Sequence, residues 1–353
     1  MIDPDCYPGR ISVVVGGQYG SEAKGHVAAQ IHANSHHRLG VRIGGPNAGH
    51  TVIDDNGVRF PLRTIPVAAA VDHGTELVIA AGSELDLDVL WEEIALLEKA
   101  GHPVRNRLMI DPQCTVITNE HKRQEADLVG KVGSTGKGIG AARAARMLRT
   151  APVAKDIDAL EPFLIDTQQV LNQYHQNGHD ILIEGTQGYH LGLHAGHYPQ
   201  STTNNCRAID CLSQAGLTPH RMPDTWLVFR TYPIRVAGNS GPMGDEIDWE
   251  QLSDATDGYI QPERTTVTNK VRRVAEWNPA AARRAVDGNG GNRNQHLHLA
   301  LMFVDYFDPT LAGATSLEQI EQSRAMPEIE AIEDDLGIGF TMFGTGPATV
   351  VWR

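Results

Sequence analysis

The chain has 353 residues, of which 41% are hydrophobic and 21% charged, and its formal net charge is −13. This is the composition of a globular protein with a sizeable core. The acidic balance argues against a broad nucleic-acid-binding surface, although a local basic pocket could still bind one anionic ligand. The sequence contains no apolar run of about 18 residues, so no membrane span is predicted. The first residues, "MIDPDCYPGR", lack the hydrophobic stretch of a signal peptide. The cysteines form no C-x-x-C pair, so we expect reduced thiols and a cytoplasmic location.

Predicted strands and helices alternate along the chain. Residues 11–15 are predicted to form a strand, and residues 22–32 the helix that follows it. A strand over 77–81 precedes a helix over 83–101, with Ser83 as its N-cap and Gly101 at its end. Further strands are expected within residues 180–185, 226–236 and 296–307. The alternation indicates an α/β protein, which we expect to be a single domain over residues 1–353 around one mostly parallel sheet.

The stretch "GGQYGSEAKG", residues 16–25, lies where the first predicted strand runs into the first predicted helix. Ligands of open α/β sheets bind at the carboxyl ends of the strands. Backbone N–H groups and the positive end of a helix attract phosphate there, and Lys24 adds a positive charge. No Ser or Thr follows the lysine, so this is not the Walker pattern. A tight strand–helix connection would explain these glycines equally well.

Further stretches with anion-binding character occur along the chain. They are "GGPNAGHT" (44–51), "STGKGIG" (134–140), "EGTQG" (184–188), "YPQSTT" (198–203), "VTNKVRR" (267–273) and "GTGP" (344–347). Glycine turns followed by lysine, hydroxyl or arginine side chains favour phosphates and carboxylates. Their number predicts a site that holds more than one anionic ligand. His190, His194 and His197 could suggest a metal, but the glycines between them favour a structural role.

These motifs, in this order, resemble the adenylosuccinate synthetase family. Enzymes of that family join aspartate to a 6-oxopurine nucleotide. A nucleoside triphosphate phosphorylates the purine 6-oxygen, and the aspartate amine then displaces that phosphate. The resemblance implies a large α/β fold around a mostly parallel central sheet with a P-loop-like phosphate-binding loop. It also implies Mg²⁺ as cofactor and a homodimer.

The resemblance also implies a set of site residues, with catalytic roles for Ser21, Lys24 and His50. The donor triphosphate would be bound by Ser21, Glu22, Ala23, Lys24, Gly25, Gly49, His50, Thr51, Arg273, Asp305, Gly344, Thr345 and Gly346. The purine monophosphate would be bound by Ser21, Asn47, Ser134, Thr135, Arg149, Gln187, Thr202 and Lys270, with Arg149 acting across the dimer interface. The aspartate substrate would be bound by Val267, Thr268 and Arg272, and Mg²⁺ by Ser21 and the Gly49 carbonyl.

Three departures from the family pattern are informative. Ser21 stands where the family has an aspartate that takes the proton from purine N1. Asp305 ends "MFVD", where the family has the guanine-reading Thr-Lys-Leu-Asp, and Lys270 stands in place of an arginine. The departures resemble a viral branch, the 2-aminoadenylosuccinate synthetases, which use dGMP instead of IMP and accept ATP or dATP. Their product leads toward diaminopurine in DNA.

A serine at position 21 has a physical explanation in that branch. Guanine carries a 2-amino group beside N1, so a carboxylate reaching N1 would crowd it, whereas a serine leaves room. A serine hydroxyl is a poor base near neutral pH, so the proton must leave to water or to a phosphate oxygen.

Three hypotheses follow from these observations. The first is a dGMP-using ligase, which in a phage would work in the host cytoplasm. The second is an ordinary adenylosuccinate synthetase that uses IMP and GTP, against which Ser21 and "MFVD" argue. The third is an inactive nucleotide-binding protein. Retention of Lys24, His50 and Arg272 argues against the third.

Overall fold

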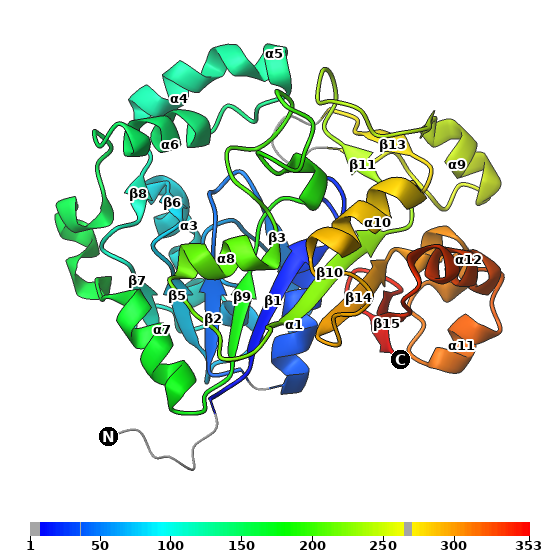
Figure 1. Ribbon diagram of the computed structural model, residues 1–353, viewed down its shortest axis with the longest axis horizontal. Coiled ribbons are helices and arrows are strands. Elements are labelled where there is room, and N and C mark those ends of the chain that lie inside the picture. The colour runs from blue at the N-terminus through cyan, green and yellow to red at the C-terminus, as the bar shows by residue number, and fades with distance from the viewer. Residues whose placement is uncertain (1–7, 36, 265–269) are drawn as a thin grey trace.

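The computed structural model describes residues 8–35, 37–264 and 270–353, which surround a nine-stranded central sheet (Figure 1). Its order is β16-β15-β14-β10-β1-β9-β2-β5-β7, and every pairing is parallel except β15 with β16. The strands are β1 (Ile11–Gly16), β2 (Leu39–Arg42), β5 (Glu76–Ile79), β7 (Leu108–Ile110), β9 (Ile181–Glu184), β10 (Asp224–Arg230), β14 (Leu297–Met302), β15 (Phe340–Gly344) and β16 (Val350–Trp352). The predicted α/β class with a mostly parallel sheet is confirmed.

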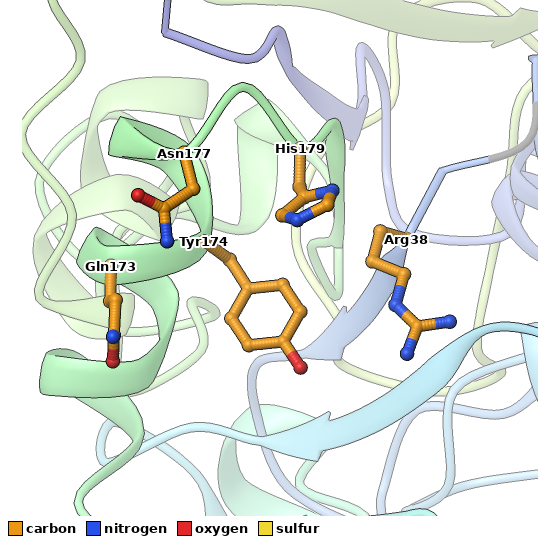
Figure 2. Close-up of a pocket in the computed structure, with 5 residues that line it drawn as sticks. All are labelled: Arg38, Gln173, Tyr174, Asn177 and His179. Carbon is orange, nitrogen blue, oxygen red and sulfur yellow. The ribbon is translucent and has the colours of Figure 1, made fainter. Parts of the chain in front are cut away.

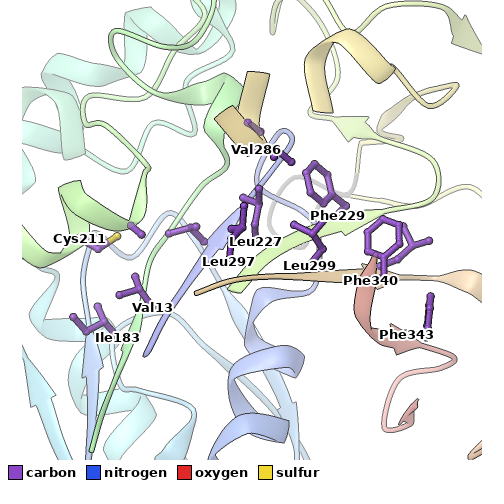
Figure 3. Close-up of a cluster of buried hydrophobic side chains, with 14 of the residues drawn as sticks. Val13, Ile183, Cys211, Leu227, Phe229, Val286, Leu297, Leu299, Phe340 and Phe343 are labelled. Carbon is purple, nitrogen blue, oxygen red and sulfur yellow. The ribbon is translucent and has the colours of Figure 1, made fainter. Parts of the chain in front are cut away.

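Helices cover both faces of this sheet, and each face has its own hydrophobic core. One core includes side chains of α7 (Thr167–Gln176), α8 (Ala208–Ala215), α10 (Pro279–Gly288), α11 (Leu317–Glu321) and α12 (Met326–Leu336). Figure 3 shows part of it, with Cys211 of α8 and Val286 of α10 beside strand residues. The other includes side chains of α1 (Lys24–Ser35), α2 (Ala68–Val71) and α3 (Leu87–Lys99). In β1, Val13 and Val15 join the first core and Val14 joins the second, as the two-residue period of a strand requires.

Smaller elements complete the described structure. The short strands are β3 (His50–Ile53), β4 (Arg59–Leu62), β6 (Glu84–Leu85), β8 (Thr115–Val116), β11 (Ile234–Arg235), β12 (Glu246–Ile247) and β13 (Arg273–Ala275). The remaining α-helices are α4 (Asn119–Glu125), α5 (Val129–Val132), α6 (Ile139–Met147) and α9 (Trp249–Ala255), and the 3₁₀ turns include η5 (Val304–Tyr306). Figure 1 shows α4 to α6 and the small β11–β13 sheet at the end of the central sheet toward which β1 runs.

The start of one predicted helix is wrong. The helix predicted over 83–101 begins at Leu87, with Asp86 as N-cap. Ser83 does not cap it, because its hydroxyl donates to the Arg42 carbonyl oxygen at 3.1 Å.

The stretch 226–236, expected to be rich in strand, contains most of β10 and all of β11, which lie in different sheets. Pro233 lies between them, and proline has no N–H to donate to a sheet. The strand expected within 296–307 is β14, which ends at Met302, where Phe303 takes a left-handed φ of 64° and η5 follows.

Buried histidines make the fold sensitive to acid, and His32 is the clearest example. It is fully buried in α1, and its ring nitrogens have no hydrogen-bond partner among the described residues. Burial lowers its pKa to about 3, whereas the unfolded chain binds this proton near pH 6.5. Between these values the unfolded state carries more protons, so the free energy of unfolding decreases as the pH falls.

We expect His32→Leu to reduce the slope of the free energy of unfolding against pH by about 1.4 kcal/mol per pH unit between pH 6 and pH 4. Urea unfolding of both proteins at several pH values in this range measures the slopes. Parallel slopes would contradict the assignment.

Candidate active site

Three of the glycine-rich stretches meet at the carboxyl ends of β1, β2 and β9. A Cβ on Gly25 would lie 2.6 Å from the Cβ of His50, so the first loop and the second are in direct contact. A Cβ on Gly44 would lie 2.3 Å from Thr186 Oγ1, which brings the second loop against "EGTQG". Only glycine allows such approaches. These three loops therefore lie together at one edge of the sheet.

Hydrogen bonds join some of the other stretches to the first loop or to one another. Arg272 donates to Ser21 Oγ at 3.1 Å, which links residues 270–273 to the first loop. Arg143 of α6, the helix that follows "STGKGIG", donates to the Thr203 carbonyl oxygen at 3.1 Å. Within that loop the Ser134 hydroxyl donates to Glu125 at 2.5 Å.

A carboxylate lies inside the first loop. Glu22 is fully buried, and its Oε1 accepts hydrogen bonds from the backbone N–H groups of Gln18 (3.1 Å) and Gly20 (2.7 Å). Its Oε2 lies 2.7 Å from Lys24 Nζ, which also donates to the Gly20 carbonyl oxygen at 3.2 Å. The Glu22 side chain therefore holds the loop together. Only the backbone of Glu22 could then contact a bound phosphate. Sequence reasoning missed this role.

His50, at the start of β3, is held by two buried charged residues. Its Nδ1 lies 2.8 Å from Glu184 Oε2 and also contacts the Arg42 guanidinium. Glu184 Oε1 accepts from the Val67 N–H at 2.7 Å, so both carboxylate oxygens are engaged. His50 Nε2 is buried and has no partner among the described residues. Burial, Arg42 and Lys24 together lower the pKa of His50 well below its usual value, which keeps the ring neutral.

Arg42 and Glu184 were not predicted as site residues, and neither was Arg230. Burial raises the pKa of Glu184 to about 7, although Arg42 opposes the shift. The three residues have one sequence feature in common: each is a charged residue at the end of a buried strand, β2, β9 or β10. Charged side chains are rarely fully buried unless paired, so this position indicates an ion pair near the ligand-binding edge.

The surroundings of Ser21 carry excess positive charge. Its hydroxyl accepts from Arg272 and its carbonyl oxygen from Arg230, each at 3.1 Å. Glu263 forms an ion pair with Arg230. Burial lowers the pKa of Arg272, and Arg230 lowers it further, while Glu263 opposes the change. Two guanidinium groups beside one carboxylate suit the binding of a further carboxylate or phosphate.

Backbone strain is concentrated among the predicted site residues. Five described non-glycine residues have left-handed φ angles, and Ala23 (67°), Gln187 (64°) and Arg149 (64°) are three of them. Such conformations cost free energy and persist mainly where function requires them. These angles mark the three positions independently of any sequence motif.

The remaining predicted residues vary in accessibility. Asn47, Thr51 and Thr202 are half-buried, whereas Gly49, Thr135, Arg149 and Lys270 are exposed. Thr345 is fully buried, and its hydroxyl donates to the Ala314 carbonyl oxygen at 2.8 Å, so its side chain is not directed toward a ligand. Its neighbours Gly344 and Gly346 are buried and half-buried. Arg273 is paired with Glu246. Val267 and Thr268 lie outside the described residues.

The protein offers few metal ligands, which fits a cation bound mainly by substrate phosphates and water. Among the described residues no three His, Cys, Asp or Glu side chains gather to hold a metal. Mg²⁺ usually takes one or two protein oxygens together with substrate phosphates and water, and the exposed Gly49 could offer its carbonyl oxygen. Ser21 Oγ faces Arg272, so it is the weaker candidate.

A separate groove lies at the opposite end of the sheet. Its volume is about 580 Å³, and Arg38, Gln173, Tyr174, Asn177 and His179 line it (Figure 2). Arg38 and His179 precede β2 and β9, so the groove is at the amino ends of the strands. None of the predicted site residues lines it.

In the described part of the chain, no helix is both long and apolar enough to span a bilayer.

A parallel sheet with glycine loops, a buried lysine and a buried histidine at its carboxyl edge defines a nucleotide-dependent α/β enzyme. A family model described as adenylosuccinate synthetase matches residues 13–158 and 150–312. The chain therefore belongs to the adenylosuccinate synthetase family. It is a carbon–nitrogen ligase that joins aspartate to a purine nucleotide with a nucleoside triphosphate, in a family that generally depends on Mg²⁺.

Relatives and solved structures support this assignment. The adenylosuccinate synthetase of Methanococcus aeolicus is 34% identical over 95% of this chain and 96% of its own length. That of Archaeoglobus fulgidus is 35% identical over 95% of each chain.

The succinoaminodeoxyadenylate synthetase of cyanophage S-2L, solved with dGMP and with dATP as an energy donor, has a TM-score of 0.79 and 26% identity. The match covers 96% of this chain and 93% of that one. The Plasmodium falciparum adenylosuccinate synthetase has a TM-score of 0.83 at 18% identity and covers 98% and 100%, which shows the shared fold.

Proposed function

We propose that the purine substrate is dGMP and that the donor is ATP or dATP. The phosphoryl group would pass from the donor to the guanine 6-oxygen, and the aspartate amine would then attack C6 and displace phosphate. The product would be N6-succino-2-amino-2′-deoxyadenylate, a precursor of diaminopurine in DNA. The observation that carries the proposal is Ser21, whose small side chain leaves space beside purine N1.

The site geometry supports named roles in this reaction. Lys24 and the first N–H groups of α1 would bind the donor phosphates, since the start of a helix leaves its N–H groups without intrahelical partners. His50 would stabilise the charge that moves between the γ-phosphate and the purine oxygen. Arg272 would bind a carboxylate of the aspartate substrate. Mg²⁺, held in part by the Gly49 carbonyl, would neutralise charge on the triphosphate.

A homodimer is part of the proposal, with Arg149 reaching the nucleotide of the partner subunit. Met147 and Leu148, just before Arg149, have 78% and 74% of their surfaces exposed. Large apolar side chains that remain this exposed are typical of surfaces that a partner covers. Sedimentation of the purified chain measures the oligomeric state directly.

We expect kcat/KM for dGMP to exceed that for IMP by at least tenfold, because hypoxanthine leaves space unfilled next to Ser21 and loses the contacts of the 2-amino group. The experiment combines the protein, Mg²⁺ and aspartate with each pairing of dGMP, GMP or IMP with ATP, dATP or GTP. Mass spectrometry identifies each product. Equal or faster turnover of IMP would overturn the proposed acceptor.

The second candidate is an ordinary adenylosuccinate synthetase that uses IMP and GTP. The observation in its favour is that the curated relatives at 34–35% identity carry that name. The same assay separates the two candidates. A protein that binds nucleotide but gives no product in any pairing would instead fit an inactive binding protein.

A further inference from the structure

The turn after β14 presents a buried carboxylate that is only partly used. Asp305 is 5% exposed, and its Oδ2 accepts a hydrogen bond from the Tyr259 hydroxyl at 2.6 Å. Its other oxygen, Oδ1, is buried and has no partner among the described residues. Burial raises the pKa of Asp305, although the Tyr259 bond opposes that change. A buried carboxylate oxygen without a partner is costly unless a ligand satisfies it.

This turn is connected to the first glycine loop through one side chain. The Arg230 guanidinium donates to the Ser21 carbonyl oxygen and lies 4.1 Å from the centre of the Phe303 ring. Phe303 begins the turn that carries Asp305, with a left-handed φ of 64°. β14 is next to β10, which is next to β1, so Asp305 lies two strands from the loop at the same edge of the sheet.

We infer that Tyr259 is a specificity-determining residue that turns Asp305 into a single-acceptor site and thereby favours an adenine donor over a guanine donor. The inference rests on the proposed adenine donor and on the family resemblance, which puts Asp305 at the donor base. Guanine offers two adjacent donors, N1–H and the 2-amino group, and pairs best with two free carboxylate oxygens. Adenine offers one donor group, its 6-amino group, beside the acceptor N1. With the Tyr259 hydroxyl on Oδ2, one oxygen remains free, which matches adenine.

Tyr259→Phe tests the inference because it removes the hydroxyl and frees Oδ2. Steady-state kcat/KM is measured with ATP, dATP and GTP at saturating aspartate, Mg²⁺ and the acceptor nucleotide that the wild-type protein turns over faster. We expect the ratio of GTP to ATP use to rise about tenfold, the effect of one hydrogen bond to a charged group. Tyr259 is 40% exposed, so the variant should fold; Tyr259→Leu removes the same hydroxyl if it does not.

Tyr306→Phe is the matched control. Its ring packs edge-on against Tyr259, but its hydroxyl donates to Glu263 at 3.4 Å and not to Asp305. We expect the GTP to ATP ratio of this variant to stay within about twofold of wild type. An adenine-preferring wild type with an unchanged ratio in Tyr259→Phe would overturn the role of Tyr259 alone. A wild type that prefers GTP would overturn the proposed donor, and the role of Tyr259 with it.

Discussion

Replacing His50 with alanine is expected to lower kcat by about 10²–10³-fold while the dissociation constants of both nucleotides change little. The reason is the arrangement of the ring: Glu184 holds Nδ1 at 2.8 Å, and the buried Nε2 is left without a partner among the described residues. Such a group contributes most when charge moves during phosphoryl transfer. Single-turnover rates and calorimetric titration measure the two quantities separately.

His179→Ala is the control for this variant, because His179 is exposed at the amino ends of the strands, opposite the site. It should keep wild-type kcat. If nucleotide affinity falls as far as kcat in His50→Ala, the histidine stabilises the ground-state complex or the loop, and its assignment to the transition state is wrong.

Ser21→Asp is expected to reduce kcat/KM for dGMP about 100-fold, even though it restores the family's base. A carboxylate beside purine N1 would crowd the 2-amino group, and a shift of about 1 Å can cost about 10²-fold in rate. Arg272, 3.1 Å from Ser21 Oγ, would also be drawn into an ion pair with the new carboxylate and away from the aspartate substrate. Because IMP has only a hydrogen at this position, crowding alone would leave its use unharmed or improved, whereas loss of Arg272 to the ion pair would lower the use of both nucleotides.

Ser21→Asn separates the two causes, since asparagine has nearly the same size as aspartate but no charge. If crowding dominates, both variants lose dGMP turnover; if the ion pair with Arg272 dominates, only Ser21→Asp does. Steady-state kinetics of the three proteins on dGMP and IMP decide between these outcomes. Faster dGMP turnover in Ser21→Asp would show that the serine is not there to make room.

Much of the fold could be predicted because its signals are local. Buried apolar runs alternate with helical patterns, and β1, β5 and β9 lie within two residues of their predicted limits. The helix start at Leu87 could not be read locally, since Ser83 is engaged by the carbonyl oxygen of Arg42, 41 positions earlier. The break between β10 and β11 could have been anticipated from Pro233.

The site was predictable in outline but not in its interior. The motifs located Lys24, His50 and Ser21, which the structure brings to one edge of the sheet. Arg42 and Glu184 are separated by 142 positions, and His50 and Glu184 by 134, so their pairing depends on the order of β2 and β9 in the sheet. The link between Arg272 and Ser21 spans 251 positions. Sequence spacing carries no information about such pairs.

Because the Glu22 carboxylate already occupies the Gln18 and Gly20 N–H groups, the first loop is preorganised for its ligand. An arriving triphosphate meets a loop whose conformational entropy has been lost during folding, so little of the binding free energy is used to order it. When all protein molecules are already in the conformation that binds, the measured affinity equals the intrinsic affinity of that conformation. In the proposed site, the affinity for the donor would then be determined by the contacts with the helix start, Lys24 and Mg²⁺, and donor binding would not have to wait for this loop to fold.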